Sequence, residues 1–313
     1  MKIVFMGTPQ FAVSTLEAIH QSHHEVVGVV TVPDRQTGRG LKLTTSPVKD
    51  YAVSHNIPLL QPEKLGDPLF QETLRTFGAD IFVVVAFRML PKTVWEIPPM
   101  GTFNLHASLL PQYRGAAPIN WAIINGETET GVTTFFINER IDEGNILLQS
   151  KTPITKDDTA ETLHDKLALI GKQLVLDTLQ RIENHDISPT PQPYTSEYKP
   201  APKIFKNDCQ INWNNNGKVV VDFIRGLSPY PAATTTFTDN KGNSIQAKIF
   251  ESSFEPAPDS RPGSIQTDSK KYLKIGVNDG YVSISSIQIS GKRRVSIAEL
   301  LRGYDITNWK INL

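Results

Sequence analysis

The sequence predicts an α/β protein in which a doubly wound, mostly parallel sheet is followed by a small β-barrel. In the first half of the chain, short apolar strands alternate with helical patterns, which is typical of parallel sheets covered by helices. In the last third, short alternating strands are separated by turn signals, which favours a small closed barrel. At 313 residues the chain is also long enough for two domains to be expected.

The first domain opens with a strand–helix–strand unit. It consists of an apolar strand at residues 2–6, a turn at Gly7-Thr8-Pro9, a helical pattern at 10–20 and a buried strand at 25–31. A turn with one glycine lacks the G-x-G-x-x-G fingerprint, which disfavours a dinucleotide-dependent oxidoreductase. The other elements expected here are helices near 46–55, 67–77, 119–125 and 160–181, and strands at 80–86, 131–137 and 146–149.

A change in composition marks the boundary between the domains. Prolines recur from residue 189 onward, and they forbid a helix and favour an extended connector. We therefore expect a first domain at 1–188, a Pro-rich linker at 189–208 and a second domain at 209–313.

Composition narrows the class of protein. Hydrophobic residues at 39% and charged residues at 20% are ordinary for a soluble globular protein. No stretch approaches the roughly 20 apolar residues that span a bilayer, so a cytoplasmic location is expected by elimination. Cys209 is the only cysteine, which excludes an intrachain disulfide and a cysteine metal cluster. Net charge is zero, but residues 209–313 carry 13 Lys and Arg against 9 Asp and Glu, which permits a polyanionic partner.

Polar residues gather where a buried strand is expected to end. Asn104 and His106 stand two residues apart, so in an extended chain both side chains project to the same face. Pro111 and Pro118 then break helix and strand alike, which indicates a constrained loop. Open α/β sheets carry their chemistry at such places. Further along, Asp142 supplies a carboxylate within an Asp-x-Gly turn.

The order Asn-x-His, Ser-Leu-Leu-Pro-x-Tyr-Arg-Gly and Asp-x-Gly resembles the family of formyltransferases that use 10-formyltetrahydrofolate. The opening Gly7-Thr8-Pro9-x-Phe11-Ala12, the Pro33-Asp34-Arg35 loop and the long C-terminal extension are similar to the members that act on methionyl-tRNA. The resemblance covers essentially the whole chain. It implies a Rossmann-like first domain, an OB-like barrel that holds tRNA, and formyl transfer to the α-amino group of methionyl-initiator-tRNA for translation initiation. It implies no metal.

The resemblance implies that Asn104, His106 and Asp142 form the catalytic set. Formyl transfer to an amine builds charge on the formyl oxygen and releases a proton from the amine. Asn104 is expected to donate to that oxygen and His106 to move the proton. Asp142 is expected to orient the imidazole or to accept the proton through water. Taken singly, each residue is better explained as a turn former or a satisfied core residue, and their joint occurrence with Leu-Leu-Pro-x-Tyr-Arg-Gly favours catalysis.

The resemblance also implies a folate pocket lined largely by backbone. Ser108 is interpreted as structural, because the substrate amine is the nucleophile and no nucleophile elbow is present. Arg88 stands where many members of the family have Gly, and residues 138–141 also depart from the family pattern. The residues expected near the folate are Ala86, Phe87, Arg88, Met89, Leu90, Ser108, Leu109, Leu110, Pro111 and Asn138.

A basic loop at residues 32–43 is longer than usual for a strand–helix connection. The resemblance implies that this loop contacts the acceptor end of the RNA, with Arg39 as the main contact, and a solvated loop is the alternative. Phe11 is expected to line the methionyl side chain, with core packing as the alternative. Ordinary surface charge remains the alternative for the basic residues. The residues expected to contact substrate or tRNA are Phe11, Arg35, Arg39, Lys42, Lys203, Lys206, Lys292, Arg293 and Arg294.

Two other functions are open at this point. One is another 10-formyltetrahydrofolate enzyme, such as a glycinamide ribonucleotide or sugar-amine formyltransferase or a formyl-folate hydrolase. The other is an RNA-binding module whose first domain is catalytically dead. The basic loop and the barrel favour tRNA over a small amine, and the intact catalytic set disfavours the dead domain. The partners expected are methionyl-initiator-tRNA and the folate co-substrate, with no membrane, and the chain is expected to be a monomer.

Overall fold

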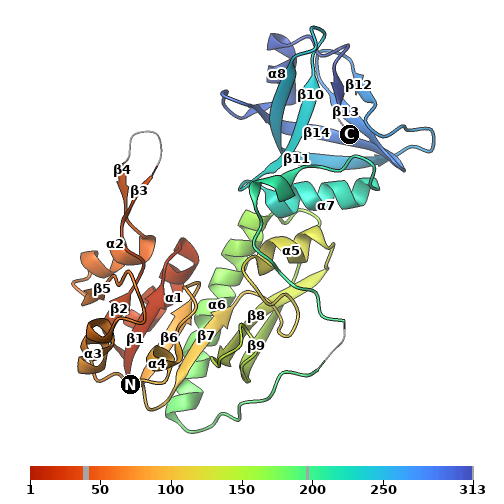
Figure 1. The fold of residues 1–313 in the computed structure, drawn as a ribbon. Coiled ribbons are helices and arrows are strands. Elements are labelled where there is room, and N and C mark those ends of the chain that lie inside the picture. The colour runs from red at the N-terminus through yellow and green to blue at the C-terminus, as the bar shows by residue number, and fades with distance from the viewer. Residues whose placement is uncertain (38–41, 195–196, 312–313) are drawn as a thin grey trace. The chain divides into compact units, whose positions relative to one another are not determined.

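A computed structural model describes residues 1–37, 42–194 and 197–311, which form two compact units (Figure 1). The first unit comprises Met1–Gly115, Glu129–Thr152 and His164–Ala201, and the second comprises Ala116–Thr128, Pro153–Leu163 and Pro202–Leu313. The Pro-rich stretch expected to separate two domains is thus divided at Ala201. Two short segments from the middle of the chain join the second unit.

A seven-stranded sheet organises the first unit. Five neighbouring strands run parallel, and β8 is antiparallel to β7. This arrangement confirms the predicted Rossmann-like, mostly parallel sheet. In spatial order the strands are β5 (Leu59–Leu60), β2 (Glu25–Val30), β1 (Lys2–Gly7), β6 (Ile81–Val85), β7 (Thr102–His106), β8 (Glu129–Phe136) and β9 (Ile146–Pro153).

Local sequence explains why these elements form. Every residue of β6 is buried, as expected for a parallel strand covered on both faces. The Ser46 and Asp67 side chains accept hydrogen bonds from the first turns of two helices, and proline follows each at the first helical position. The helices are α1 (Gln10–His20), α2 (Pro47–Ser54), α3 (Pro68–Thr76), α4 (Lys92–Trp95) and α6 (Ala160–Glu183), which begins in the second unit.

Within the basic loop predicted after β2, the strand β3 (Arg35–Thr37) pairs antiparallel with β4 (Lys42–Thr44). Asp34 holds its base, because the carboxylate accepts hydrogen bonds from Lys49 Nζ at 2.5 Å and Gln61 Nε2 at 2.9 Å. These bonds, that from Lys49 first, lower the pKa of Asp34. Arg39 lies outside the described residues.

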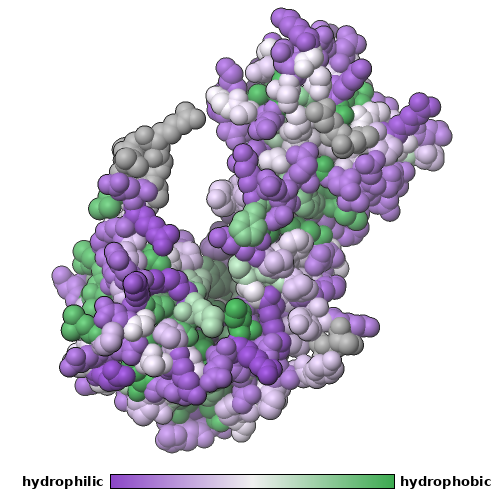
Figure 2. Space-filling model, in the orientation of Figure 1, coloured by the Kyte–Doolittle hydropathy of each residue, from purple (hydrophilic) through white to green (hydrophobic). Residues whose placement is uncertain are grey.

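The second unit is built on an antiparallel sheet that is nearly barrel-shaped, which confirms the predicted barrel. Trp213 is fully buried in its core and donates from Nε1 to Thr235. Hydrophilic residues predominate on the face visible in Figure 2. The path of strands is β12 (Ile265–Thr267), β13 (Leu273–Val277), β14 (Gly280–Ile289), β11 (Ser244–Pro256), β10 (Ala233–Thr238) and β16 (Lys310–Ile311), with β15 (Val295–Ser296) beside β14.

Helix α7 (Gly217–Leu227) fixes the two borrowed segments to the barrel. Asn120, on α5 (Pro118–Ile124), donates to the carbonyl of Gly226 at 2.8 Å. Arg225 donates to the carbonyls of Thr155 and Asp158 at 3.1 and 2.9 Å. These contacts explain why the segments belong to the second unit. The remaining elements are the 3₁₀ helix η1 (Lys206–Cys209) and α8 (Ile297–Gly303).

None of the helices in the described part of the chain is long and apolar enough to cross a membrane.

Candidate active site

Asn104 and His106 lie at the carboxyl end of β7, and His106 is the last residue of that strand. Asn104 pairs with Val84 on one side and Phe135 on the other, so it lies in the middle of the sheet. Residues two apart in a strand share a face, and both side chains therefore project from the same face of β7. His106 is only 6% exposed. Asn104 is half-buried, and within residues 1–37, 42–194 and 197–311 its carboxamide has no hydrogen bond.

The His106 imidazole lies between a backbone carbonyl and a carboxylate. Its Nε2 lies 2.8 Å from the carbonyl oxygen of Tyr113, and its Nδ1 lies 3.8 Å from Asp142 Oδ2. A carbonyl oxygen only accepts, so Nε2 carries the hydrogen. Nδ1 is then the nitrogen that gains or loses a proton. At 3.8 Å the carboxylate is near enough to pair with a protonated imidazole, but too far for a direct hydrogen bond.

Asp142 is held by its backbone and by its side chain. Its Oδ2 accepts a hydrogen bond from the Gly115 amide at 2.8 Å, and its backbone carbonyl accepts one from Gln192 Nε2 at 2.7 Å. Its φ of +53° is a left-handed conformation that costs free energy for a residue with a Cβ. The turn also passes close to β8, because a Cβ on Gly144 would lie 1.6 Å from the Phe136 oxygen.

The loop after His106 is fixed by buried hydroxyl groups. Ser108 is fully buried and donates to the carbonyl of Gln112 at 2.6 Å. Thr133 on β8 donates to the Ser108 carbonyl at 2.6 Å and accepts from the Leu110 amide at 3.1 Å. Gly115 has a φ of +123°, and a Cβ there would lie 2.4 Å from the carbonyl of Ala201. The loop therefore requires glycine at this position.

The residues expected near the folate differ in accessibility. Arg88 donates to the carbonyls of Pro62 and Glu63 at 2.7 and 3.0 Å, and burial, followed by the neighbouring Arg35, lowers its pKa. The Arg88 side chain therefore connects the turn after β6 to the loop that contains Pro62 and Glu63. The backbone of Ala86 is left-handed, with a φ of +48°. Leu90, Ser108 and Leu110 are buried, Phe87, Leu109 and Pro111 are half-buried, and Ala86, Met89 and Asn138 are exposed.

The residues expected to contact substrate or tRNA lie in both units. Phe11 is 6% exposed and packs edge-on against His164, with ring centroids 5.3 Å apart. Arg35 is exposed on β3, and the Lys42 side chain is outside the described part. Lys203, Lys206 and Lys292 are exposed, Arg293 pairs with Glu299 at 3.3 Å, and Arg294 pairs with Glu251 and lies over the Phe250 ring.

A polar cavity of about 640 Å³ lies on the barrel of the second unit. Lys206 and Lys248 contribute to its wall, together with Thr234, Gln246 and Gln288. These side chains offer hydrogen-bond donors without an aromatic ring on which a base could stack.

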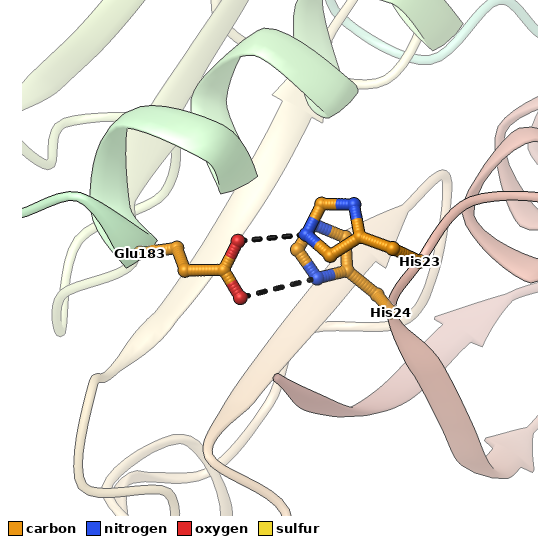
Figure 3. Close-up of side chains that lie close together, drawn as sticks. All are labelled: His23, His24 and Glu183. Carbon is orange, nitrogen blue, oxygen red and sulfur yellow. Dashed lines mark hydrogen bonds and ion pairs between the residues drawn. The ribbon is translucent and has the colours of Figure 1, made fainter.

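His23, His24 and Glu183 could hold a metal ion, because one ligand atom from each lies within 4.8 Å of the others (Figure 3). The carboxylate faces both imidazoles: His23 Nε2 lies 2.7 Å and His24 Nδ1 3.8 Å from its oxygens. The α-amino group of Met1 lies 3.3 Å from the same carboxylate. The group borders the start of β2, at the opposite edge of the parallel sheet from His106, so it is not part of the catalytic set.

Sequence reasoning missed the residues that hold the catalytic loops. Gln192 donates to the Asp142 and Gly144 carbonyls and accepts from Arg114, whose side chain also pairs with Glu143 at 2.9 Å. Arg114 stood within a recognised motif and was given no role of its own. A glutamine between two prolines gives no signal of partners about 50 residues away in the chain.

Two domain models match the chain. The model described as formyl transferase matches residues 1–179, and that described as formyl transferase, C-terminal domain matches residues 203–305. The chain belongs to the formyl transferase family.

Among relatives in this family, the chain is 52% identical to a methionyl-tRNA formyltransferase from Bacteroides thetaiotaomicron, over 100% of the chain and 98% of that protein. It is 48% identical to one from Flavobacterium johnsoniae, over 97% of the chain and 96% of that protein.

Two solved structures share the fold. An N-formyltransferase from Helicobacter canadensis, solved with folinic acid and dTDP-3-aminofucose, has a TM-score of 0.66 at 24% identity and covers 94% of the chain and 100% of its own length. HypX from Aquifex aeolicus, solved with tetrahydrofolic acid, has a TM-score of 0.60 at 18% identity over 100% of the chain and 51% of its own length.

Proposed function

We propose that the protein transfers a formyl group from 10-formyltetrahydrofolate to the α-amino group of methionyl-initiator-tRNA. The observation that carries the proposal is similarity along the whole chain, at 52% identity, to a methionyl-tRNA formyltransferase. The convergence of Asn104, His106 and Asp142 at the end of β7 supplies groups that the reaction needs. Formylated methionyl-tRNA then serves translation initiation.

The reaction exchanges one carbon–nitrogen bond for another. The neutral amine of the methionyl group attacks the formyl carbon, and the bond from that carbon to N10 of the folate breaks. One proton leaves the amine and one proton reaches N10, so the products are N-formylmethionyl-tRNA and tetrahydrofolate. Between these states the formyl oxygen carries negative charge, and the site must stabilise that charge and move the proton.

The catalytic set has one residue for each task. The Asn104 carboxamide projects from the end of β7, where it can donate to the formyl oxygen. His106 has Nε2 committed to Tyr113, so Nδ1 takes the amine proton and passes it on. Asp142 lies 3.8 Å from Nδ1 and stabilises the imidazolium as it forms. The fixed carbonyl of Tyr113 keeps the ring in one orientation.

Two structural neighbours support a folate co-substrate, because one was solved with folinic acid and another with tetrahydrofolic acid. In this chain the turn after β6, residues 86–90, and the loop after β7 border the catalytic strand. Exposed Ala86 and Met89 are the parts of this turn that a folate ring can reach, whereas buried Leu90 packs into the hydrophobic core.

Acceptor choice tests this function most directly. Purified protein would be incubated with 10-formyltetrahydrofolate, methionyl-tRNA and an excess of a small amine such as a dTDP-amino sugar. We expect formylmethionyl-tRNA as the main product, no turnover by His106→Ala, and retained tRNA binding by that variant. Preference for the amino sugar would overturn the acceptor, and full activity of His106→Ala would overturn the mechanism. Release of formate without an acceptor would indicate a formyl-folate hydrolase.

A further inference from the structure

Beyond α6, two described stretches, residues 190–194 and 197–201, contact the loops that hold the catalytic set. In the first stretch, Thr190 and Ile146 exchange two backbone hydrogen bonds of 2.8 Å beside the Asp142 turn. In the second stretch, the Lys199 carbonyl accepts from the Tyr113 amide at 2.7 Å, and the Ala201 amide donates to the Arg114 carbonyl at 2.8 Å. The two stretches therefore do more than join two units, because they contact the catalytic loops directly.

We propose that Gln192 is a positioning residue for Asp142 and that it fixes the two catalytic loops relative to each other. Both the nitrogen and the oxygen of the Gln192 carboxamide form hydrogen bonds. Nε2 donates to the carbonyl of Asp142 at 2.7 Å and to that of Gly144 at 2.9 Å. Oε1 accepts from Arg114 Nε at 3.1 Å and Nη2 at 2.6 Å. The inference rests on the proposed function, because it concerns the same site.

The surroundings allow only one orientation of this carboxamide. Two carbonyl oxygens face one end and a guanidinium faces the other, so turning the group over would place donor against donor and acceptor against acceptor. Arg114 is itself fixed by its ion pair with Glu143 at 2.9 Å and lies over the Tyr198 ring. Gln192 therefore connects the Arg-Gly loop to the Asp-x-Gly turn by hydrogen bonds with fixed polarity.

Asp142 needs such support because its backbone is strained. A left-handed φ of +53° on a residue with a side chain persists only where neighbours enforce it. Without Gln192, the Asp142 side chain keeps one hydrogen bond, to the Gly115 amide. The carboxylate lies 3.8 Å from His106 Nδ1. A small shift of the turn would change this distance, and with it the electrostatic stabilisation of the protonated imidazole. A displacement of a catalytic group by about 1 Å lowers turnover, while substrate binding is retained.

The test uses two substitutions in the full chain. Gln192→Glu keeps an acceptor toward Arg114 but removes both donors to the Asp142 turn, and Gln192→Ala removes all four hydrogen bonds. The matched control is Gln180→Glu, which makes the same change at an exposed position of α6. With rates expressed per folded enzyme, kcat should fall about 10- to 100-fold in both Gln192 variants. KM for methionyl-tRNA should stay within about threefold, and Gln180→Glu should match the wild type.

A second measurement does not depend on activity. Amide hydrogen exchange of residues 139–145 should be faster in both Gln192 variants than in the wild type, while exchange in β1 and β6 is unchanged. Should Gln192→Ala unfold, Gln192→Glu carries the test. Wild-type kcat and wild-type exchange would overturn the proposal, as would a rise in KM for tRNA with kcat unchanged. An inactive wild-type enzyme would defeat the proposed function, and exchange would still decide whether Gln192 positions the turn.

The connection to Arg114 gives an independent check. Arg114→Lys keeps a charge for Glu143 but loses the fork that binds Gln192 Oε1. If the two residues act through the same turn, the Arg114→Lys, Gln192→Ala double variant should be no slower than the slower single variant. Multiplicative losses in the double variant would show that the residues act separately, which contradicts the proposal.

Discussion

Asn104 is the residue whose removal isolates one step of the chemistry. Its carboxamide is half-buried near the carboxyl end of β7, so Asn104→Ala removes a donor without opening the core. We expect kcat for formylation to fall about 10²- to 10³-fold, as when a single oxyanion donor is lost, with little change in the folate KM. Steady-state kinetics with both substrates measures this. Asn184→Ala, at an exposed position, is the control, and a loss confined to KM would assign Asn104 to binding.

His24 gives a prediction for stability rather than activity. It is buried, and this burial, followed by the charges of His23 and the Met1 ammonium, lowers its pKa below 6.5, although Glu183 acts in the opposite sense. Between the lowered value and 6.5, the unfolded chain binds more protons than the folded one. The contribution of neutral His24 to the free energy of unfolding is therefore fully present above about pH 6.5. It is lost as the pH falls from 6.5 through the lowered pKa of the folded state.

The melting temperature should consequently fall between pH 7 and pH 5.5, and His24→Asn should flatten this dependence. Glu183 also has a lowered pKa, from its hydrogen bond with His23 first, but its loss of stability begins only below about pH 4.5. Thermal unfolding at several pH values distinguishes the two groups. His185→Asn serves as the control, because His185 is exposed and asparagine tolerates its left-handed backbone. An unchanged slope in His24→Asn would contradict the assignment.

At the level of elements, strong periodicity made most of the first unit predictable. The apolar strands at 2–6 and 80–86 and the long helix at 160–181 correspond to β1, β6 and α6. Helix α7 was not predicted, although Val220, Ile224 and Leu227 recur at helical spacing, because the last third of the chain was expected to form short strands. The alternate spacing of Asn104 and His106 predicted that both residues share a strand, and both lie on β7. The role of Gln192 could not be predicted from the sequence, because its partners at Asp142 and Gly144 are backbone carbonyls, which any residue offers.

The contact between α5 and α7 depends on the absence of a side chain at Gly226. A Cβ there would lie 2.7 Å from the Ile124 side chain and 3.1 Å from the Asn120 carbonyl. Gly226→Ala should destabilise the second unit by about 1–3 kcal/mol, because one of the two contacts is rigid backbone. Denaturant unfolding followed by tryptophan fluorescence, to which the buried Trp213 contributes, measures this. Gly303→Ala, where the added carbon meets nothing within 4 Å, should change stability far less, and equal effects would refute the packing argument.

At the level of the whole molecule, the catalytic candidates and the basic excess lie in different units. The catalytic set and its supporting loops lie within the first unit, whereas the barrel carries the basic excess of the C-terminal third. The two segments that the barrel borrows, Ala116–Thr128 and Pro153–Leu163, leave and re-enter the first unit on either side of β8 and β9. The borrowed segments therefore continue directly along the chain into β8 and β9, and β8 pairs with the strand that carries His106.

The basic residues of the second unit are expected to differ in their importance for tRNA. Lys206 and Lys292 are exposed and have no acidic partner among the described residues, whereas Arg293 is already paired with Glu299. A phosphate contact by an unpaired lysine releases a counterion without first breaking an ion pair. Lys206→Ala and Lys292→Ala should each raise KM for methionyl-tRNA several-fold and lower the slope of log K against log salt by about one.

Arg293→Ala should have a smaller effect, because Glu299 competes with phosphate for the guanidinium. Formylation kinetics between about 50 and 200 mM salt provide the measurement. Lys151→Ala is the matched control, since Lys151 is paired with Glu129 on β8 at 3.0 Å. If both lysine variants keep the wild-type slope while Arg293→Ala changes it, the ion pair with Glu299 does not hold in solution and the phosphate-contacting side chain is Arg293.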